Sequence, residues 1–241
     1  YKHSDKVVSL LPYAEEYMKN HGLKDGKFVC IPNGIIEEEW KNPLPLPEQH
    51  KKVLEELHRE KKFVVGYFGG HALSNALDNL IEVAKKTDDN DICFVLVGDG
   101  VEKERLIKRS IEMKLDNVIF LETIQKKSIP SLCKEFDCIY IGALESTLYR
   151  FGLCMNKMFD SMMAGKPIIC AITTPETYIE EYGCGVRVDS DDINGCLKSI
   201  EKIKKMSKGE IIMMCQKGRT AALETFNYES LADKFEKIIY K

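Results

Sequence analysis

Apolar residues along this chain fall into two alternating patterns. Short unbroken runs such as FVLVG and PIICAI lack the every-second-residue alternation of a half-exposed strand, as expected for strands covered on both faces. Between them lie longer stretches in which apolar residues recur at helical spacing. This alternation of buried strands with amphipathic helices predicts an α/β fold built on a Rossmann-like, doubly wound parallel sheet.

The same pattern gives the order of the elements. Strands are predicted at Lys6–Leu10, Phe28–Pro32, Phe63–Phe68, Ile92–Val97, Val118–Leu121, Cys138–Ile141, Pro167–Ile172 and Val186–Val188. Helices are predicted at Pro12–Asn20, Gln49–Lys62, Leu77–Lys86, Glu102–Lys114, Ser128–Phe136, Asn156–Ala164, Glu176–Tyr182, Ile193–Met206, Glu210–Phe226 and Tyr228–Tyr240. The proline-rich segment Ile35–Pro47 reads as an irregular linker, and Gln49–Lys62 as a helix with a solvated, charged face. The last three helices have no strand between them, which predicts a helical C-terminal extension.

Composition narrows the class of protein. The 241 residues suffice for one large domain, and a formal net charge of -3 lacks the basic excess of a nucleic-acid-binding protein. Nine cysteines without a C-x-x-C pair predict a reducing, cytoplasmic setting rather than a disulfide or zinc framework. The five histidines are dispersed, so we expect no metal site. No apolar run approaches the roughly 20 residues that a membrane span needs.

Candidate chemistry gathers where the predicted strands end, because ligands of open α/β sheets bind beyond the carboxyl ends of the strands. Gly69 and Gly70 follow the strand Phe63–Phe68, and paired glycines let backbone N–H groups approach a phosphate. His71, the next residue, can donate to a phosphate or sugar oxygen. An exposed loop histidine without a ligand is an equal alternative.

Two further strand exits offer backbone groups. Gly98 opens a tight turn in which Asp99 fits turn and helix-capping chemistry better than ligand contact. Thr123 and Ile124 follow another strand, and their backbone could read the edge of a nucleobase. The motifs of P-loop, H-E-x-x-H and G-x-S-x-G proteins are absent from the sequence.

The stretch Leu144–Ala171 is the richest of these exits. A helix N-terminus presents free N–H groups and partial positive charge, so a phosphate can bind there. Lys157 would add a full charge, and Asp160 an acceptor for sugar hydroxyls. An ordinary strand-to-helix turn with a solvated lysine is the alternative reading. The polar loop and helix start consist of Glu145, Ser146, Tyr149, Arg150, Gly152, Asn156, Lys157 and Asp160. Together the exits favour a ligand that carries phosphate.

Several motifs, taken in order, resemble one known family. They are IPNGI at 31–35, VGDG at 97–100, NVIF at 117–120 and GKPI at 165–168. In this order they resemble the C-terminal domain of group 1 (family 4) retaining glycosyltransferases of the GT-B fold. YRFG at 149–152 followed by NKMFD at 156–160 is similar to the subgroup that uses nucleotide-activated amino or deoxy sugars in bacterial surface polysaccharide synthesis.

The resemblance implies that 1–241 is one nucleotide-sugar-binding domain. It would comprise an interdomain segment (1–62), the core sheet (63–190) and C-terminal helices (191–241). An N-terminal domain of the same enzyme, expected to be missing from this chain, would supply the acceptor side of the cleft, and the final helix would return to it. Without that domain the chain would be inactive.

The resemblance also implies roles for the candidate residues. Lys157 and Arg150 would stabilise the leaving diphosphate, together with the helix start at Asn156. Ser146 and Tyr149 would meet the diphosphate or the donor sugar. Asp160 would hold ribose hydroxyls. The remaining donor contacts would come from Gly69, Gly70, His71, Gly98, Thr123, Ile124 and Gly152. The reaction would need no metal and no cofactor, and UDP is favoured over GDP as the carrier of the donor sugar.

The sequence departs from the family pattern at two places. Asp160 stands at the second of the family's two glutamates, but Tyr149 stands at the first. The arginine–lysine pair that usually follows the first glycine loop is missing, and His71 and Asn75 stand nearby instead. Neutralisation of a diphosphate would therefore rest on Lys157, Arg150 and the helix N–H groups.

The resemblance also implies partners and a location. The expected partners are a nucleotide sugar and a saccharide or lipid-linked acceptor, with no nucleic acid. The full-length protein would be cytoplasmic and peripheral at the inner face of the membrane.

Two other functions of the chain stay open. A nucleotide-sugar epimerase of similar fold is one alternative, but it would need an acid–base carboxylate pair that the sequence does not nominate. A non-catalytic nucleotide-binding module is the other.

Overall fold

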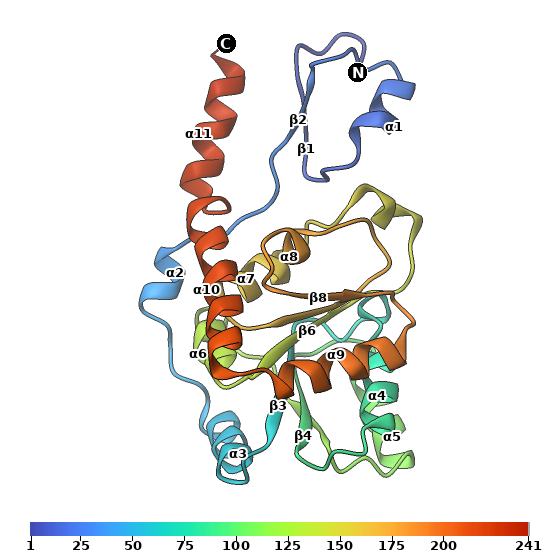
Figure 1. Cartoon of the computed structure of the whole chain (residues 1–241), viewed down its shortest axis with the longest axis vertical. Helices are drawn as coiled ribbons and strands as arrows, with labels where there is room; N and C mark the ends of the chain where they lie inside the picture. Colours follow the sequence, from blue (N-terminus) through green and yellow to red (C-terminus); the bar gives the residue numbers. More distant parts are fainter. Residues whose placement is uncertain (241) are drawn as a thin grey trace.

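The centre of the molecule is a parallel sheet whose strands run in the order β5-β4-β3-β6-β7-β8 (Figure 1). The computed structural model describes residues 1–240. The strands are β3 (Phe63–Phe68), β4 (Ile92–Val97), β5 (Val118–Leu121), β6 (Cys138–Gly142), β7 (Ile168–Ala171) and β8 (Gly185–Val188). The strand order reverses between β3 and β6, and such a switch point is where open α/β sheets bind ligands. The predicted doubly wound sheet is confirmed.

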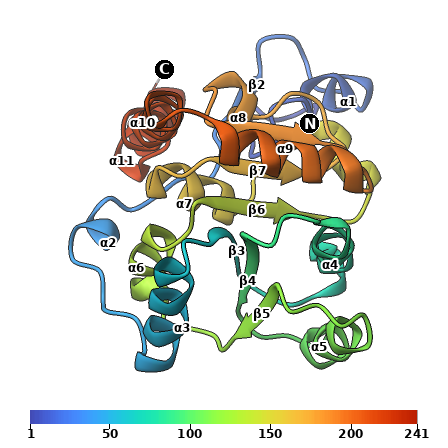
Figure 2. The same ribbon diagram turned by 60° about the horizontal axis from the view of Figure 1, so that its bottom comes forward.

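Helices cover both faces of this sheet (Figure 2). One face carries α4 (Leu77–Lys86), α5 (Lys103–Glu112) and α9 (Ile193–Lys205). The other carries α3 (Glu48–Arg59), α6 (Ile129–Lys134), α7 (Asn156–Ala164), α8 (Tyr178–Glu181) and α10 (Lys208–Glu224). The two layers explain the unbroken apolar runs of the sequence, because both sides of each central strand are buried.

The alternation of side chains along β3 shows how the two cores are divided. Val65 and Tyr67 pack into the cluster under α4, whereas Val64 and Phe68 pack into the cluster under α3 and α6. All four side chains are buried, at 0–6% exposure. Successive residues of a strand point to opposite faces, so one apolar run feeds both cores.

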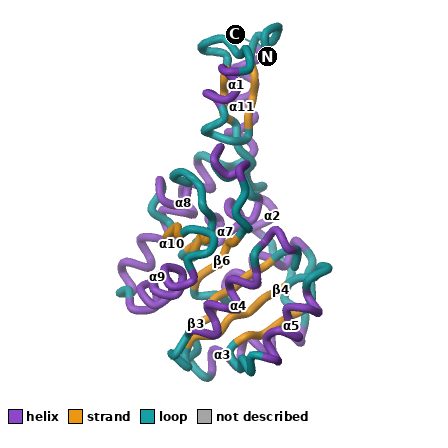
Figure 3. The backbone as a smooth tube through the Cα atoms, turned by 90° about the vertical axis from the view of Figure 1, so that its right-hand side faces the viewer, coloured by secondary structure: helices purple, strands orange, loops and turns teal. Residues whose placement is uncertain are grey.

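A projection, thin in the view of Figure 3 and broad in that of Figure 1, rises from one end of the sheet and is called the column below. It contains β1 (Val7–Ser9), α1 (Glu15–Asn20), β2 (Phe28–Cys30) and the end of α11 (Tyr228–Ile239). Strands β1 and β2 pair in parallel. Ile35 forms a parallel bridge with Asn227, and Lys234 Nζ donates to the Cys30 carbonyl over 2.8 Å. The first and last parts of the described chain are therefore held together.

The segment predicted as an irregular linker contains a short helix, α2 (Glu38–Lys41), and the loop after β6 contains a 3-10 turn at Thr147–Phe151. The predicted solvated helix at Gln49–Lys62 is α3, and its inner face buries His50, Leu54 and Leu57. That burial makes α3 part of the core layer as well as a charged surface.

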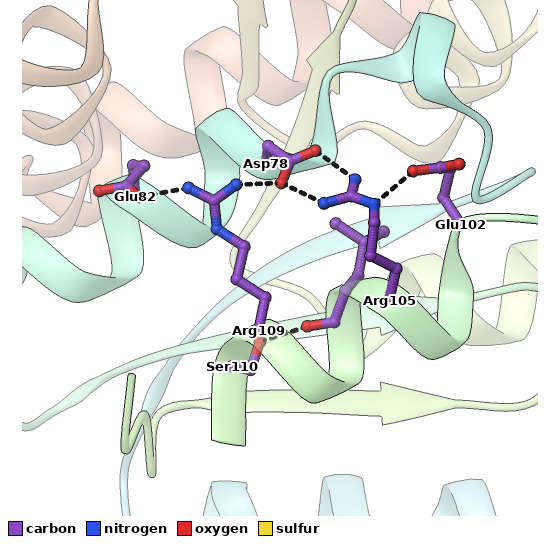
Figure 4. A network of polar contacts seen from close by, with 7 residues as sticks. Asp78, Glu82, Glu102, Arg105, Arg109 and Ser110 are labelled. Carbon is purple, nitrogen blue, oxygen red and sulfur yellow. Dashed lines mark hydrogen bonds and ion pairs between the residues drawn. The ribbon is translucent and has the colours of Figure 1, made fainter. Parts of the chain in front are cut away.

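A charged network fixes the start of α4 against α5 (Figure 4). Asp78 accepts hydrogen bonds from Arg105, with oxygen–nitrogen distances of 2.9 and 2.5 Å, and also from Arg109. Glu102 pairs with Arg105 at 2.6 Å, and Glu82 with Arg109 at 2.5 Å. The network lies just beyond the loop that leaves β3, so it anchors that loop from its far end.

Within residues 1–240, no helix is both long and apolar enough to cross a membrane. The nine cysteines are free thiols, and most of them are buried. Buried free cysteine packs as a small hydrophobic residue, which matches the position of Cys93, Cys138 and Cys170 inside the strands.

Candidate functional site

The feature that marks the site is Lys157, whose partly buried ammonium donates to two neutral partners. Its Nζ donates to Asn75 Oδ1 over 2.9 Å and to the Tyr67 hydroxyl over 3.2 Å. Nζ also lies 4.7 Å from the centre of the Tyr67 ring. Among the described residues, no carboxylate lies within ion-pair distance of this ammonium. Burial lowers the pKa of Lys157 to about 8, which is the effect of an ammonium taken from water without a counter-charge.

The glycine loop after β3 lies against this ammonium. A Cβ placed on Gly69 would lie 3.5 Å from the Lys157 Nζ. The carbonyl of Gly70 accepts from the Tyr67 hydroxyl at 2.7 Å and from the Asn75 amide at 2.9 Å. The loop and the lysine are thus held by the same two side chains, one at the end of β3 and one before α4.

Gly98 permits this loop to lie where it does. A Cβ on Gly98 would come within 1.9 Å of the Gly69 carbonyl oxygen, and its φ of 150° is rarely adopted by other residues. Gly98, which the sequence predicted as a contact of the donor sugar nucleotide, therefore allows the backbones at the exits of β3 and β4 to approach closely.

His71 is buried rather than exposed, so the alternative of an exposed loop histidine is wrong. Its side chain is 0% exposed, and neither ring nitrogen has a hydrogen-bond partner among the described residues. The ring lies between Tyr67 and Phe120, with centroids 5.9 and 6.0 Å away. Burial, and then the charge of Lys103, lower the pKa of His71 to about 4. The imidazole is neutral at pH 7 and keeps unused hydrogen-bonding capacity.

Helix α7 begins beside the same ammonium. It starts at Asn156, and Met155 before it provides no side-chain cap. The N–H groups of Asn156 and Lys157 have no partner among the described residues, whereas the Met158 N–H donates to the Met155 carbonyl at 3.0 Å. Asn33, from the motif after β2, donates to the Asn156 side chain at 2.9 Å and to the Cys154 carbonyl at 3.1 Å. The Asn33 side chain therefore fixes the backbone at the start of α7.

The loop before α7 is held against α1. Ser146 Oγ caps the 3-10 turn by accepting from the Leu148 N–H at 3.3 Å. The Tyr149 carbonyl accepts from Thr174, and burial raises the pKa of the Tyr149 hydroxyl. A Cβ on Gly152 would meet Pro12 at 2.8 Å. These contacts fix the loop backbone.

Arg150 stacks on aromatic rings at the foot of the column. Its guanidinium carbon lies 4.6 Å from the Phe151 ring centre and 5.9 Å from that of Tyr17. Lys157, by contrast, contacts Tyr67 and Asn75. The structure does not bring these two predicted cations together.

Asp160 lies in a narrow cavity between α2, α6 and α7. The cavity has a volume of about 10 Å³ and is lined by Glu39, Trp40, Lys126, Ile129, Pro130 and Asp160. Burial raises the pKa of Asp160 to about 6, and Lys126 opposes this shift. Such a volume admits about one water molecule. In this conformation Asp160 has no room for a sugar.

Thr123 and Ile124 follow β5 at the same edge of the sheet. Thr123 is exposed, whereas Ile124 is partly buried and packs on the cluster around α3. Sequence reasoning missed Tyr67, because it lies inside a strand that reads as pure core. It also gave Asn75 no part in holding the lysine. The sequence signal for both is their distance from the glycine pair, two residues before and five after it.

A parallel sheet whose switch point brings together a glycine loop, a helix N-terminus and a lysine with neutral partners is an arrangement typical of proteins that bind phosphate-bearing ligands. Residues 48–217 match the family of glycosyl transferases group 1, so the chain belongs to that family. The resemblance inferred from the sequence is confirmed.

Curated relatives agree with this membership. The chain is 28% identical over 144 residues to WcaI of Escherichia coli, which is assigned to colanic acid biosynthesis as a glycosyl transferase. It is 23% identical over 184 residues to the poly(ribitol-phosphate) alpha-N-acetylglucosaminyltransferase of Staphylococcus aureus. These matches cover 58% and 74% of this chain but 30% and 35% of the relatives. The chain thus spans about a third of the length of these relatives.

Solved structures share the fold. Anabaena HepE, determined with UDP and glucose, superposes with a TM-score of 0.75 at 17% identity, covering 99% of this chain and 63% of that one. WaaG, a glycosyltransferase involved in lipopolysaccharide biosynthesis, superposes with a TM-score of 0.68 at 14% identity, covering 97% and 62%. At these identities the likeness establishes the fold.

Proposed function

We propose that this chain is the donor-binding part of a retaining glycosyltransferase that takes a nucleotide-diphosphate sugar, with UDP favoured over GDP. The observation that carries the proposal is the Lys157 ammonium, held by Tyr67 and Asn75 with no carboxylate partner within residues 1–240. A partly buried cation without a counter-ion gains from binding an anion. Anabaena HepE, whose structure contains UDP and glucose, supports a nucleotide sugar as that anion.

In this proposal the diphosphate lies between Lys157, the Gly69–Gly70 loop and the start of α7. As the bond to the sugar breaks, negative charge grows on the leaving diphosphate. Donors already fixed in place stabilise that charge without reorganising. Lys157 and the α7 N–H groups would supply the stabilisation, and no residue of this part of the chain needs to move a proton.

The other subsites follow from the strand exits. The nucleobase would meet the backbone of Thr123 and Ile124. Ribose hydroxyls would reach Asp160 only after Lys126 and Glu39 move aside, because the present cavity holds about one water. His71, whose side chain is fully buried between Tyr67 and Phe120, would meet a donor hydroxyl only after the glycine loop moves.

Transfer itself would need a second domain that carries a saccharide or lipid-linked acceptor. The relatives are about three times as long as the matched region. We expect the chain by itself to bind the donor and to leave it unreacted.

Calorimetry of this chain with UDP and with GDP tests the proposal. Lys157→Ala should weaken UDP binding at least tenfold, since a charge-assisted contact contributes about 1.5–3 kcal/mol. Lys108→Ala is the matched control, because the Lys108 side chain is 78% exposed on α5. Failure of the unaltered chain to bind either nucleotide, or equal binding by the Lys157 variant, would contradict the proposal.

A further inference from the structure

The segment between α2 and α3 runs along the turn that follows β5. Five long-range contacts join the two. At the two ends, Glu39 pairs with Lys126 at 2.7 Å, and His50 pairs with the Glu122 carbonyl at 2.8 Å. Between them, the Leu44 N–H donates to the Lys127 carbonyl at 3.0 Å. Two hydroxyls donate in the other direction, Ser128 Oγ to the Pro45 carbonyl at 3.2 Å and Ser131 Oγ to the Leu44 carbonyl at 2.7 Å. Residues 39–50, called the strap from here on, therefore hold the backbone of residues 122–131.

His50 makes the innermost of these contacts. Its side chain is 3% exposed, and its Nε2 lies 2.8 Å from the Glu122 carbonyl oxygen. A carbonyl only accepts, so Nε2 must carry a proton. Nδ1 is buried without a partner among the described residues. An apolar side chain would fill the same space without an unpaired ring nitrogen, so packing alone does not account for a histidine here.

The same strand exit is held from its other side by Lys103. Its ammonium lies 3.3 Å from the Leu121 carbonyl and 2.9 Å from a Glu122 carboxylate oxygen. The backbone at 121–122 is thus fixed from α3 and from α5. The next residues, Thr123 and Ile124, are those assigned to the nucleobase in the proposed function.

We propose that His50 is a positioning residue for the nucleobase of the donor. By holding the Glu122 carbonyl, it orients the peptide groups of Thr123 and Ile124 so that they face the base. This inference rests on the proposed function for the identity of the ligand. The orienting effect itself concerns only the protein and can be measured without ligand.

The test compares two variants of His50 with a control on the same helix. His50→Leu removes the donor and keeps the bulk, whereas His50→Gln keeps an N–H that can reach the carbonyl. His58→Leu is the matched control, because His58 Nε2 bonds to the Glu135 carbonyl at 3.0 Å, away from the β5 exit. Each variant is titrated with UDP and with inorganic pyrophosphate, and amide hydrogen exchange is followed at residues 122–125.

We expect His50→Leu to weaken UDP binding about tenfold, as for the loss of one hydrogen bond that orders the site. Pyrophosphate binding should stay within about twofold, because that ligand does not reach residues 122–125. His50→Gln should restore UDP binding to within about threefold, and His58→Leu should change neither ligand. Exchange at 122–125 should quicken in His50→Leu alone.

Three results would overturn the inference: unchanged exchange at 122–125 in His50→Leu, an equal loss of pyrophosphate and UDP binding, or no recovery with glutamine. A different result, in which the unaltered chain binds neither UDP nor pyrophosphate, would overturn the proposed function and with it the ligand assigned here. The exchange measurement would then still decide whether His50 orders the turn.

Discussion

Within four residues of chain, this protein holds cations in two opposite ways. At Asn75, the Lys157 ammonium is met by an amide oxygen and a hydroxyl, both neutral. At Asp78, the guanidinium groups of Arg105 and Arg109 are met by carboxylates. Three carboxylates, those of Asp78, Glu82 and Glu102, pair with these two guanidinium groups, as Figure 4 shows, so neither cation needs an anionic ligand. The difference separates cations that are paired within the protein from the one that the proposed function assigns to an anion.

The largest effect on the contrast between these two regions is expected from Lys157→Met. Removing the ammonium should weaken UDP binding about 10- to 100-fold. The same change should raise the free energy of unfolding by about 1–2 kcal/mol, because an uncompensated partly buried charge is replaced by an apolar side chain. Calorimetry and urea unfolding measure the two effects. A variant that loses stability yet keeps its nucleotide affinity would reverse the interpretation of this lysine.

The second test is the pH dependence of UDP binding. Because the pKa of Lys157 is lowered to about 8, the ammonium loses its proton above that pH. The affinity should be level near pH 7 and fall towards about tenfold per pH unit above pH 8, since the bound form holds the proton. The unfolded chain binds more protons than the folded one between pH 8 and 10.5, so this group's contribution to stability rises with pH there. In Lys157→Met, the fall of UDP affinity above pH 8 should disappear. If the affinity of that variant still fell in the same way, a group other than Lys157 would cause the pH dependence.

The third test breaks the compensated region. Asp78→Asn leaves two guanidinium groups without their shared carboxylate, and should lower the free energy of unfolding by about 1–3 kcal/mol. The affinity for UDP should change less than about twofold, because the change lies on the α4–α5 side of the loop. Urea unfolding and calorimetry again provide the readouts. If UDP binding fell as far as in the Lys157 variant, the two regions would not be independent.

The smallest effect is expected from Arg150→Ala. The guanidinium stacks 4.6 Å from the Phe151 ring centre, so its loss should change UDP affinity by less than about threefold. Calorimetry with UDP checks this expectation directly. A tenfold loss would mean that Arg150 leaves its aromatic partners to reach the diphosphate, as the sequence resemblance implies.

Periodicity located the central strands closely. β3, β4 and β5 begin and end where predicted, because each is an apolar run with glycine or polar residues on both sides. The start of α7 at Asn156 was also predicted. These features depend on local sequence, where side-chain period and helix-breaking residues dominate.

The remaining features depend on contacts between distant residues. The bond from His50 to Glu122 joins residues 72 apart, and that from Asn33 to Asn156 joins residues 123 apart. Nothing in the spacing of the strap predicts that it follows the turn after β5. Likewise, the Tyr17 ring meets Arg150 only because α1 folds back onto the loop. Sequence pattern gives the sheet, whereas tertiary contact decides which polar group serves the site.

The bond between β2 and α11, inside the column, also bears on how the chain folds. Lys234 and Cys30, which it joins, are 204 residues apart. Closing so long a loop carries a large entropic cost unless the intervening sheet has already formed and brought its ends near. We therefore expect the sheet to assemble first and the column to form last and open first. Local opening of that column would loosen Asn33 and Arg150 while leaving the bonds of Lys157 to Tyr67 and Asn75 in place.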